Sequence, residues 1–494
     1  QGKSNTTTSS IESSIMGLSN EMSTSHQSMI LGKSNKMIDA KGSVLLGEAN
    51  DTSGNSTNIL TSGYKNQVTG GNNNIAFGNT SILKTTDNAL SSGLQNTITD
   101  GSNNTTLGNL NQLDSAHNTL LSGKNNIVKE TFQSTIIGES NDVSGNTTNS
   151  FVSGKTNYEN NGNNNTTLGQ SNINKHSTNV LMSGLSNKNN STTHSLTVGL
   201  SNDLYDCSGS IIAGENNILK NNKTISVFGS ANDVSGNTVD SIVVGNINKE
   251  KSGTRNATFG YNNTITSATN NITSGSSNDL TSATNNITSG SSNILINGSN
   301  NAIFGGSNNE TSTNNSLLTG LSNTSNNSNY ILTQGFGNVI SSTNYSIISG
   351  TNHSEINGDT NTIFGKTQTV SDSSAVLLSG FNHTINESYF SNIHGQSNIV
   401  KDSSNVSIFG HTHNIDTTTN IMASGHLHDV SGNTKQSLVS GYNHKENNGQ
   451  NNSTFGSTQI VKNTINWNDG PKTGLINGEY YPVFETPKTY FLSI

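Results

Sequence analysis

The sequence predicts an all-β fold, a single long β-solenoid (a parallel β-roll) made of coils of fifteen residues. A glycine recurs at Gly2, Gly17, Gly32 and Gly47 and continues to Gly456, and only four of the thirty steps contain sixteen residues. A short apolar segment precedes each of these glycines, and an asparagine usually follows three residues later. A period this short indicates one supersecondary unit that is stacked on itself.

The composition supports a thin coil and excludes several functions. Only 28% of the residues are apolar and 11% are charged, which would be typical of disorder if the sequence did not repeat. The net charge of -8 includes no basic patch, so we expect no nucleic-acid partner. We also expect no membrane span, because no apolar run is long enough. The single cysteine, Cys207, excludes a disulfide framework within the chain and suits a secreted protein. The chain opens at Gln1, within a repeat, which suggests a processed or truncated N-terminus.

The segment before each glycine is predicted to be a strand, as at residues 118–123 and 405–410. Strand alternation places the residues three and one before the glycine on the same face. Their sizes compensate: Leu120 accompanies Ser122, whereas Thr105 accompanies Leu107. A nearly constant total volume is typical of a narrow, close-packed interior. The sequence therefore predicts that this pair faces inward.

The residue two before the glycine is then predicted to face outward. It is apolar or threonine in almost every coil. An exposed apolar row would not stay solvated, so it indicates self-association, as a homo-oligomer or a filament, or else a flat ligand surface. The predicted self-association row comprises Leu121, Val152, Met182, Val243, Ile348, Leu378 and Ile408.

The residue three after the glycine is predicted to form a ladder. It is asparagine in most coils and another hydrogen-bonding residue in the rest. Identical amides stacked roughly 4.8 Å apart can bond along the stack and also to the turn backbone. The predicted ladder includes Asn20, Asn66, Asn126, Asn217 and Asn338, with His413 and His428 at equivalent positions.

Two local features depart from the plain repeat. The four longer steps carry the pattern Asp-x-Ser-Gly-Asn, as at residues 142–146, and we interpret each as an enlarged outer turn in preference to a ligand site. In addition, His411 and His413 are followed fifteen residues later by His426 and His428. In an oligomer these four imidazoles could bind a transition metal; alternatively, His413 and His428 replace ladder asparagines. We expect no other cofactor and no enzyme activity, because no catalytic motif is present.

The repeat ends after Gly456, which divides the chain into a solenoid (residues 1–460) and a non-repeat segment (residues 461–494). A solenoid needs a cap over its last open strand edge, and capping is the preferred interpretation of the tail. The alternative is a joint that pairs with the first coil of another molecule. That joint would use Trp467, Tyr480, Tyr481, Phe484 and Phe491.

Two families resemble the repeat. Residues 149–154 (NSFVSG) and 405–410 (NVSIFG) resemble the head repeats of YadA-type trimeric autotransporter adhesins. This resemblance implies a left-handed parallel β-roll, a homotrimer, display on a cell surface, and host or matrix molecules as partners. Residues 270–280 (NNITSGSSNDL) are similar to ryegrass-type ice-binding β-rolls. The row Thr258, Thr273 and Thr288 would supply a local ice-binding patch, which Ile303, Leu318 and Met182 interrupt.

The sequence thus favours a non-enzymatic extracellular structural protein, a fibre or adhesin shaft that associates with itself. Two alternatives stay open: an ice-binding solenoid, and a phage or virion fibre.

Overall fold

The computed structural model describes residues 2–463, 468–469, 473–476 and 479–482. Every secondary-structure element in these residues is a β-strand. Parallel coils about 15 residues apart form a β-solenoid of about 31 turns. The predicted fold class is therefore confirmed.

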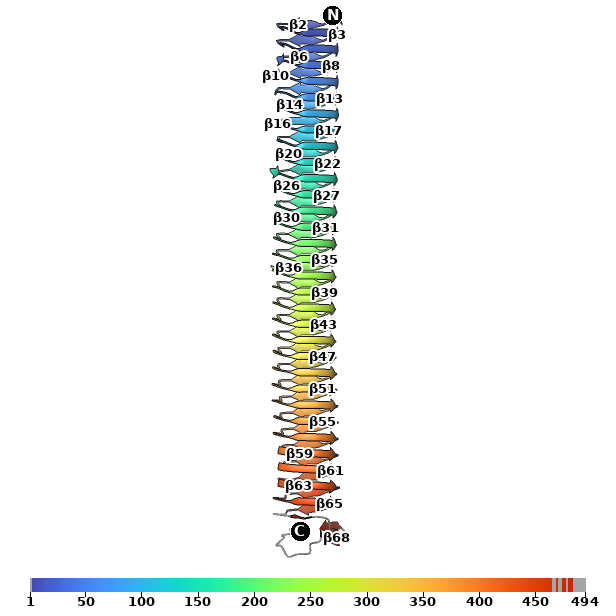
Figure 1. The fold of residues 1–494 in the computed structure, drawn as a ribbon, viewed down its shortest axis with the longest axis vertical. Coiled ribbons are helices and arrows are strands. Elements are labelled where there is room, and N and C mark those ends of the chain that lie inside the picture. The colour runs from blue at the N-terminus through green and yellow to red at the C-terminus, as the bar shows by residue number, and fades with distance from the viewer. Residues whose placement is uncertain (1, 464–467, 470–472, 477–478, 483–494) are drawn as a thin grey trace. The chain divides into compact units, whose positions relative to one another are not determined.

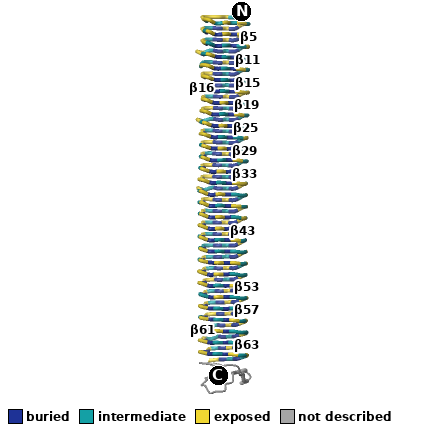
Figure 2. Tube along the Cα trace, in the orientation of Figure 1, coloured by how far each residue is buried: buried dark blue, intermediate teal, exposed yellow. Residues whose placement is uncertain are grey.

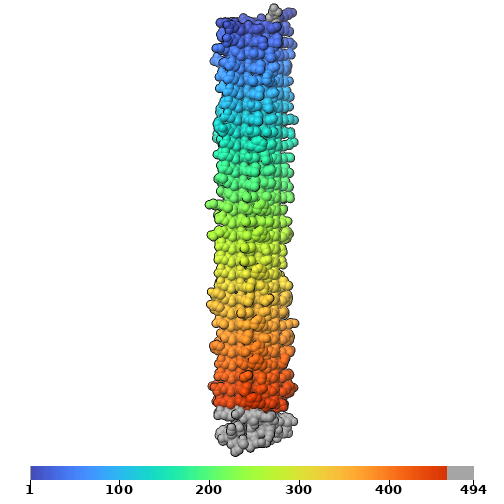
Figure 3. Space-filling view, in the orientation of Figure 1, coloured from blue at the N-terminus to red at the C-terminus, as the bar shows by residue number. Residues whose placement is uncertain are grey.

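The chain divides into two compact units, Gln1–Ser252 and Gly253–Ile494. Within each unit the colours of the ribbon and of the space-filling view follow the sequence, so that each coil lies on the coil before it (Figures 1 and 3). A coil therefore contacts its sequence neighbours, as expected for a repeat architecture.

Each coil contributes two strands with fixed positions. The longer strand runs from three residues before the repeat glycine to one residue after it, as in β19 (Leu120–Lys124). The shorter strand runs from four to six residues after the glycine, as in β20 (Ile127–Lys129). The strands that depart from this rule are β1 (Gly2–Lys3), β7 (Ala40–Lys41), β10 (Ser56–Thr57), β14 (Ile82–Asp87), β16 (Thr97–Ser102), β21 (Thr131–Phe132), β24 (Thr147–Thr148), β59 (Ser404–His411), β61 (Thr419–His426) and β63 (Lys435–Tyr442), together with three strands of the C-terminal segment described below.

The strands pair in parallel with a register of one coil. β17 (Thr105–Asn109) pairs with β19 so that Gly108 lies opposite Gly123. Backbone hydrogen bonds continue through the corners, where the N–H of Asn125 donates to the carbonyl of Asn109 over 2.9 Å. Because equivalent residues of successive coils face each other, every coil repeats the chemistry of its neighbours at the same place.

Residues with positive φ turn the chain at the corners of each coil. After Gly123 these are Asn125 (φ 55°), Glu130 (φ 51°) and Gln133 (φ 52°). The repeat glycine itself has a positive φ, 127° at Gly123, and a Cβ there would lie 1.9 Å from the carbonyl oxygen of Gly138. No side chain fits at that distance, which explains why the glycine recurs so strictly.

The four sixteen-residue steps are enlarged turns, as predicted. In one of them Gly145 (φ 69°) and Asn146 (φ 57°) add a second residue of positive φ to the corner. The hydroxyl of Thr147 donates to the carbonyl of Ser144 over 2.7 Å and closes the turn. The extra residue is thus accommodated locally, and the strands on either side keep their register.

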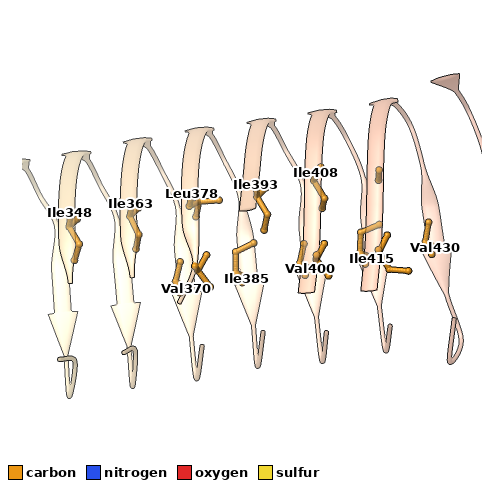
Figure 4. Close-up of a cluster of buried hydrophobic side chains, with 14 of the residues drawn as sticks. Ile348, Ile363, Val370, Leu378, Ile385, Ile393, Val400, Ile408, Ile415 and Val430 are labelled. Atoms are coloured by element: carbon orange, nitrogen blue, oxygen red, sulfur yellow. The ribbon is translucent and has the colours of Figure 1, made fainter. Parts of the chain in front are cut away.

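The core contains the row that was predicted to face outward. Leu121, Val152, Met182, Val243, Ile348, Leu378 and Ile408 are all 0–1% exposed. A second buried row, five residues after each glycine, faces the first; Figure 4 shows Val370 with Leu378, Ile385 with Ile393, and Val400 with Ile408 as such pairs. The dark blue stretches of the coils in Figure 2 are the buried residues, to which these rows belong.

The prediction for the two faces of the longer strand is therefore wrong. Alternation defines two faces but does not say which one is inside. A buried row stacks on itself at the spacing of the coils, which favours apolar or small residues, and the position two before the glycine carries such a residue in every coil. The size-compensated pair lies outside instead: Leu120 is 38% exposed and Phe151 is 37% exposed.

The C-terminal segment continues briefly as strand. β67 (Asn468–Asp469) pairs in parallel with β65 (Ser453–Ser457), and β68 (Thr473–Ile476) forms an antiparallel pair with β69 (Glu479–Pro482). Of the residues proposed for a polymer joint, Tyr480 and Tyr481 lie in β69. Trp467, Phe484 and Phe491 lie outside the described residues, so the joint stays a prediction.

Candidate interaction face and internal ladders

The predicted asparagine ladder is present and buried. The side-chain amide of Asn126 donates to Oδ1 of Asn111 (3.0 Å) and to the carbonyl of Gly138 (2.8 Å). Oδ1 of Asn111 also accepts the backbone N–H of Asn126 (3.1 Å). Each rung thus ties three neighbouring coils together and satisfies buried backbone groups. Asn20, Asn66, Asn217 and Asn338 make the same kinds of contact.

Two further polar columns were missed by the sequence analysis. Four residues before the glycine, a second buried column includes Asn271 and Asn286, whose side chains bond to each other over 3.0 Å. Five residues before the glycine, an exposed column of asparagines bonds along the surface, as from Asn103 to Asn118 over 2.9 Å. The frequent Asn-Asn and Asn-Ser pairs before the strands were the signal that could have found both.

In the second unit, histidines replace several ladder asparagines. His353, His383, His413, His428 and His444 are all buried at the ladder position. The rings of His413 and His428 stack with centroids 4.6 Å apart, and those of His428 and His444 stack at 5.0 Å. Two causes lower the pKa of His413 to about 3: burial is the larger, and the neighbouring imidazole of His428 is the smaller. Burial also lowers the pKa of His428 to about 4. These rings are therefore neutral at physiological pH.

The four candidate metal ligands do not converge within the chain. His413 and His428 point into the ladder, whereas His411 is exposed on the outward face and His426 lies beside it, with ring centroids 6.2 Å apart. Among the residues that the structure describes, no group of three or more metal-ligating side chains is found. The replacement of ladder asparagines is thus the interpretation that the geometry supports.

Five glutamates lie in the second core row. Oε1 of Glu355 accepts hydrogen bonds from Oγ of Ser346 (2.8 Å) and Nδ2 of Asn361 (2.7 Å). Burial raises the pKa of Glu355 to about 7. A Cβ at Gly358 would lie 2.2 Å from Oε1, so this glycine makes room for the carboxyl. The five are Glu159, Glu250, Glu310, Glu355 and Glu446.

The buried glutamates have a sequence signal. In four of the five, a glycine follows three residues later, giving the pattern Glu-x-x-Gly. The same row otherwise holds mainly aliphatic residues, with Thr52, Asn174, Asn189 and Ser325 as its other buried polar members, so each glutamate places a carboxyl in a largely apolar row. The pairs Glu159 with Ser150 (2.6 Å) and Glu446 with Ser437 (2.5 Å) repeat the contact of Glu355.

The outward face of the longer strands is the candidate interaction face. We use this name for the residues three and one before each glycine. Its large side chains are about two-fifths exposed, as at Leu107, Leu120, Ile137, Phe151 and Leu181 in the first unit. Monomeric proteins seldom expose apolar side chains in such unbroken succession. The second unit carries the same face, with Phe259, Ile272, Ile287, Phe304, Ile347 and Phe364 among its exposed members.

The threonine row proposed for ice binding is not on the surface. Thr258, Thr273 and Thr288 are 0–1% exposed and belong to the first core row. They cannot contact ice in this fold, so that basis for the ice-binding hypothesis is wrong.

No protein-family model and no curated protein matches the sequence. The resemblances to adhesin heads and to ice-binding rolls therefore stay predictions. Among the described residues, no helix is long and apolar enough to cross a membrane.

Proposed function

We propose that this chain is a non-enzymatic extracellular structural protein, a shaft or fibre that associates with copies of itself. The observation that carries the proposal is the candidate interaction face, which repeats an exposed apolar side chain in coil after coil of each unit. Removing such a face from water is favourable in proportion to its apolar area. Host or matrix molecules are the further partners that the adhesin resemblance implies.

The internal ladders support a mechanical role. Their amides bond from coil to coil in each unit, as at Asn126 and Asn338, and add to the continuous backbone pairing. A stack held in this way needs few buried aliphatic residues, which agrees with the 28% apolar composition. The near absence of thiols suits the extracellular location that we propose.

Light scattering on the purified chain, combined with negative-stain microscopy, tests the proposal. We expect a mass of two or more chains and elongated or filamentous particles. A single-chain mass at micromolar concentration, together with ice-shaping activity, would overturn it in favour of the ice-binding alternative.

A further inference from the structure

In most coils of the interaction face, one of the two residues is large and the other is small. The coils with two large residues are Met29/Leu31, Val44/Leu46, Ile75/Phe77, Leu196/Val198 and Ile242/Val244. From the coil of Gly93 to that of Gly184 the pairs alternate without a break. They are Leu90/Ser92, Thr105/Leu107, Leu120/Ser122, Thr135/Ile137, Phe151/Ser153, Thr166/Leu168 and Leu181/Ser183.

Most coils of the second unit keep this pairing even where the alternation lapses, and Leu332/Gln334 and Asn392/His394 are the exceptions. Ile272/Ser274 and Ile287/Ser289 follow each other with the large residue in the same column, yet each coil still has one large and one small member. The compensation is therefore a property of the single coil. Strict alternation between neighbouring coils is not required.

Nothing inside one chain requires this compensation. The two residues of a pair are separated by a buried residue and point away from the core, so they do not compete for interior volume. Two large residues at these positions would simply enlarge the exposed apolar area. A constant volume per coil is expected only if a second surface packs against both positions.

We infer that two copies of this chain pack face to face, parallel and in register, through the interaction face. The two-fold axis of this pair runs along the stack and lies above the residue two before the glycine. It exchanges the two columns of the face, which are the residues three before and one before each glycine. Leu120 of one chain then lies opposite Ser122 of the other, and Ser122 lies opposite Leu120. In each compensated coil the large residue then meets a small one, which is the compensation that most of the coils show, whereas a coil such as Val44/Leu46 places two large residues opposite each other. This inference rests on the self-association proposed above.

An antiparallel pair does not give the same match. Its two-fold axis would place each column opposite itself, so that large residues meet large ones wherever the alternation lapses. Ile272 and Ile287 are such neighbours in one column. The parallel arrangement accommodates these coils because it places the two positions of the same coil opposite each other.

The available area is sufficient for a stable pair. A large apolar side chain that is about 40% exposed leaves roughly 70 Å² uncovered. A dozen coils therefore present on the order of 800 Å², which is the area that one partner buries in a standard stable interface. Two flat sheets that pack in this way lie about 10 Å apart.

The rim of the face is polar, as in other protein interfaces. The residues one after the glycine include Lys124, Glu139 and Lys155, and the last two form a surface ion pair of 3.5 Å. In the parallel pair this column lies over the exposed asparagine column of the partner, which contains Asn118 and Asn149. Amide side chains can accept from lysine and donate to glutamate, so the rim is compatible along its length.

Cross-linking between two differently tagged full-length chains tests the inference. One chain carries Leu120→Cys and the other carries Ser122→Cys, and a short bis-maleimide is added. We expect the mixed product to exceed either like-with-like product at least tenfold. A mixed product that is no more abundant than the like-with-like products would overturn the inference. The native Cys207 is buried and does not interfere, and Gln112→Cys, exposed on the opposite sheet, is the control that should not cross-link.

The mass of the same samples separates the two proposals. A two-chain mass without the mixed cross-link would overturn the parallel register and leave self-association standing. A three-chain mass would overturn the face-to-face pair, and a single-chain mass would overturn both proposals.

A swap within the coil provides a second test. Ser122→Leu, Ser153→Leu and Ser183→Leu together place large residues opposite large ones and should weaken association at least tenfold. Adding Leu120→Ser, Phe151→Ser and Leu181→Ser moves each large residue to the other position and should restore association to within about threefold of the wild type. Tighter association by the first variant, or no restoration by the second, would contradict the inference.

Discussion

The two compact units share one coil but differ in the chemistry of their ladder. In the first unit the described ladder consists of amides, with Ser81 as its exception, whereas from His353 onward five of the eight ladder residues of the second unit are histidines. Both kinds of side chain fill the site and reach the turn backbone, as Asn126 and His428 do. The ladder position therefore accepts an amide or an imidazole, and only the imidazoles add a titration to it.

The largest expected difference between the units is their response to acid. In the unfolded chain an imidazole has a pKa near 6.5, whereas the folded values are about 3 for His413 and about 4 for His428. The unfolded state therefore binds more protons below pH 6.5, and stability decreases as the pH falls from about 6.5 to about 4. We expect amide exchange, corrected for intrinsic rates, to accelerate at least tenfold at pH 4 over residues 411–444. Exchange over residues 111–141 should change less than threefold, and an equal acceleration in both segments would contradict the comparison.

Replacing the imidazoles with amides should remove the difference. The variant with His413→Asn, His428→Asn and His444→Asn is expected to keep residues 411–444 protected at pH 4. The matched control carries His411→Asn and His426→Asn on the outward face and should stay acid-sensitive. Exchange mass spectrometry distinguishes the two, and protection in the control alone would show that the surface histidines cause the effect.

Transferring one imidazole to the first unit should reproduce the effect on a smaller scale. Asn126→His is expected to fold at pH 8 with a loss of about 1 kcal/mol, because one net hydrogen bond of the rung is removed. At pH 4 exchange should accelerate about fivefold in the coils next to residue 126. Unchanged exchange there would mean that the acid response needs the stacked histidines of the second unit.

The smallest expected effect appears as the pH rises from acid to neutral. Burial raises the pKa of Glu355 from its ordinary 4.5 to about 7, so the folded state keeps a proton that the unfolded state releases. Stability therefore decreases as the pH rises from about 4.5 to about 7. We expect Glu355→Gln to lessen the loss of protection near residue 355 between pH 5 and pH 9 by about threefold. Glu21→Gln, at an exposed position, is the control that should behave as the wild type.

Much of the fold was readable from the sequence because its causes are local. The glycine of each coil is required by the close approach of the next coil, as at Gly123. The ladder asparagines sit at one fixed distance from that glycine, so their stacking follows once the coil is accepted. These features depend on spacing alone.

The sequence did not predict correctly which face of the longer strand is buried and which is exposed. Leu121 and Leu120 are both apolar, and alternation assigns them to opposite faces without choosing between those faces. Compensating volumes suggested an interior, but the structure places Leu120 and Ser122 outside. The better signal was that the residue two before the glycine is apolar or small in every coil, as is favoured for a row that stacks on itself in the core.

The buried glutamates required knowledge of the second core row. A carboxyl in an apolar row is unexpected because an unpaired charge there is costly. Ser346 and Asn361 bind the carboxyl of Glu355, and its raised pKa favours the neutral form. The Glu-x-x-Gly pattern is informative only once the residues around the carboxyl are known.

Sedimentation velocity on one outward-face variant tests the central claim most directly. The variant carries Leu120→Lys, Phe151→Lys and Leu181→Lys, three residues that are about two-fifths exposed and do not belong to the core. We predict that the wild type sediments as two chains, and that the variant sediments as one chain with an unchanged far-ultraviolet circular dichroism spectrum. Equal masses for the two proteins would contradict the claim that this face joins the chains.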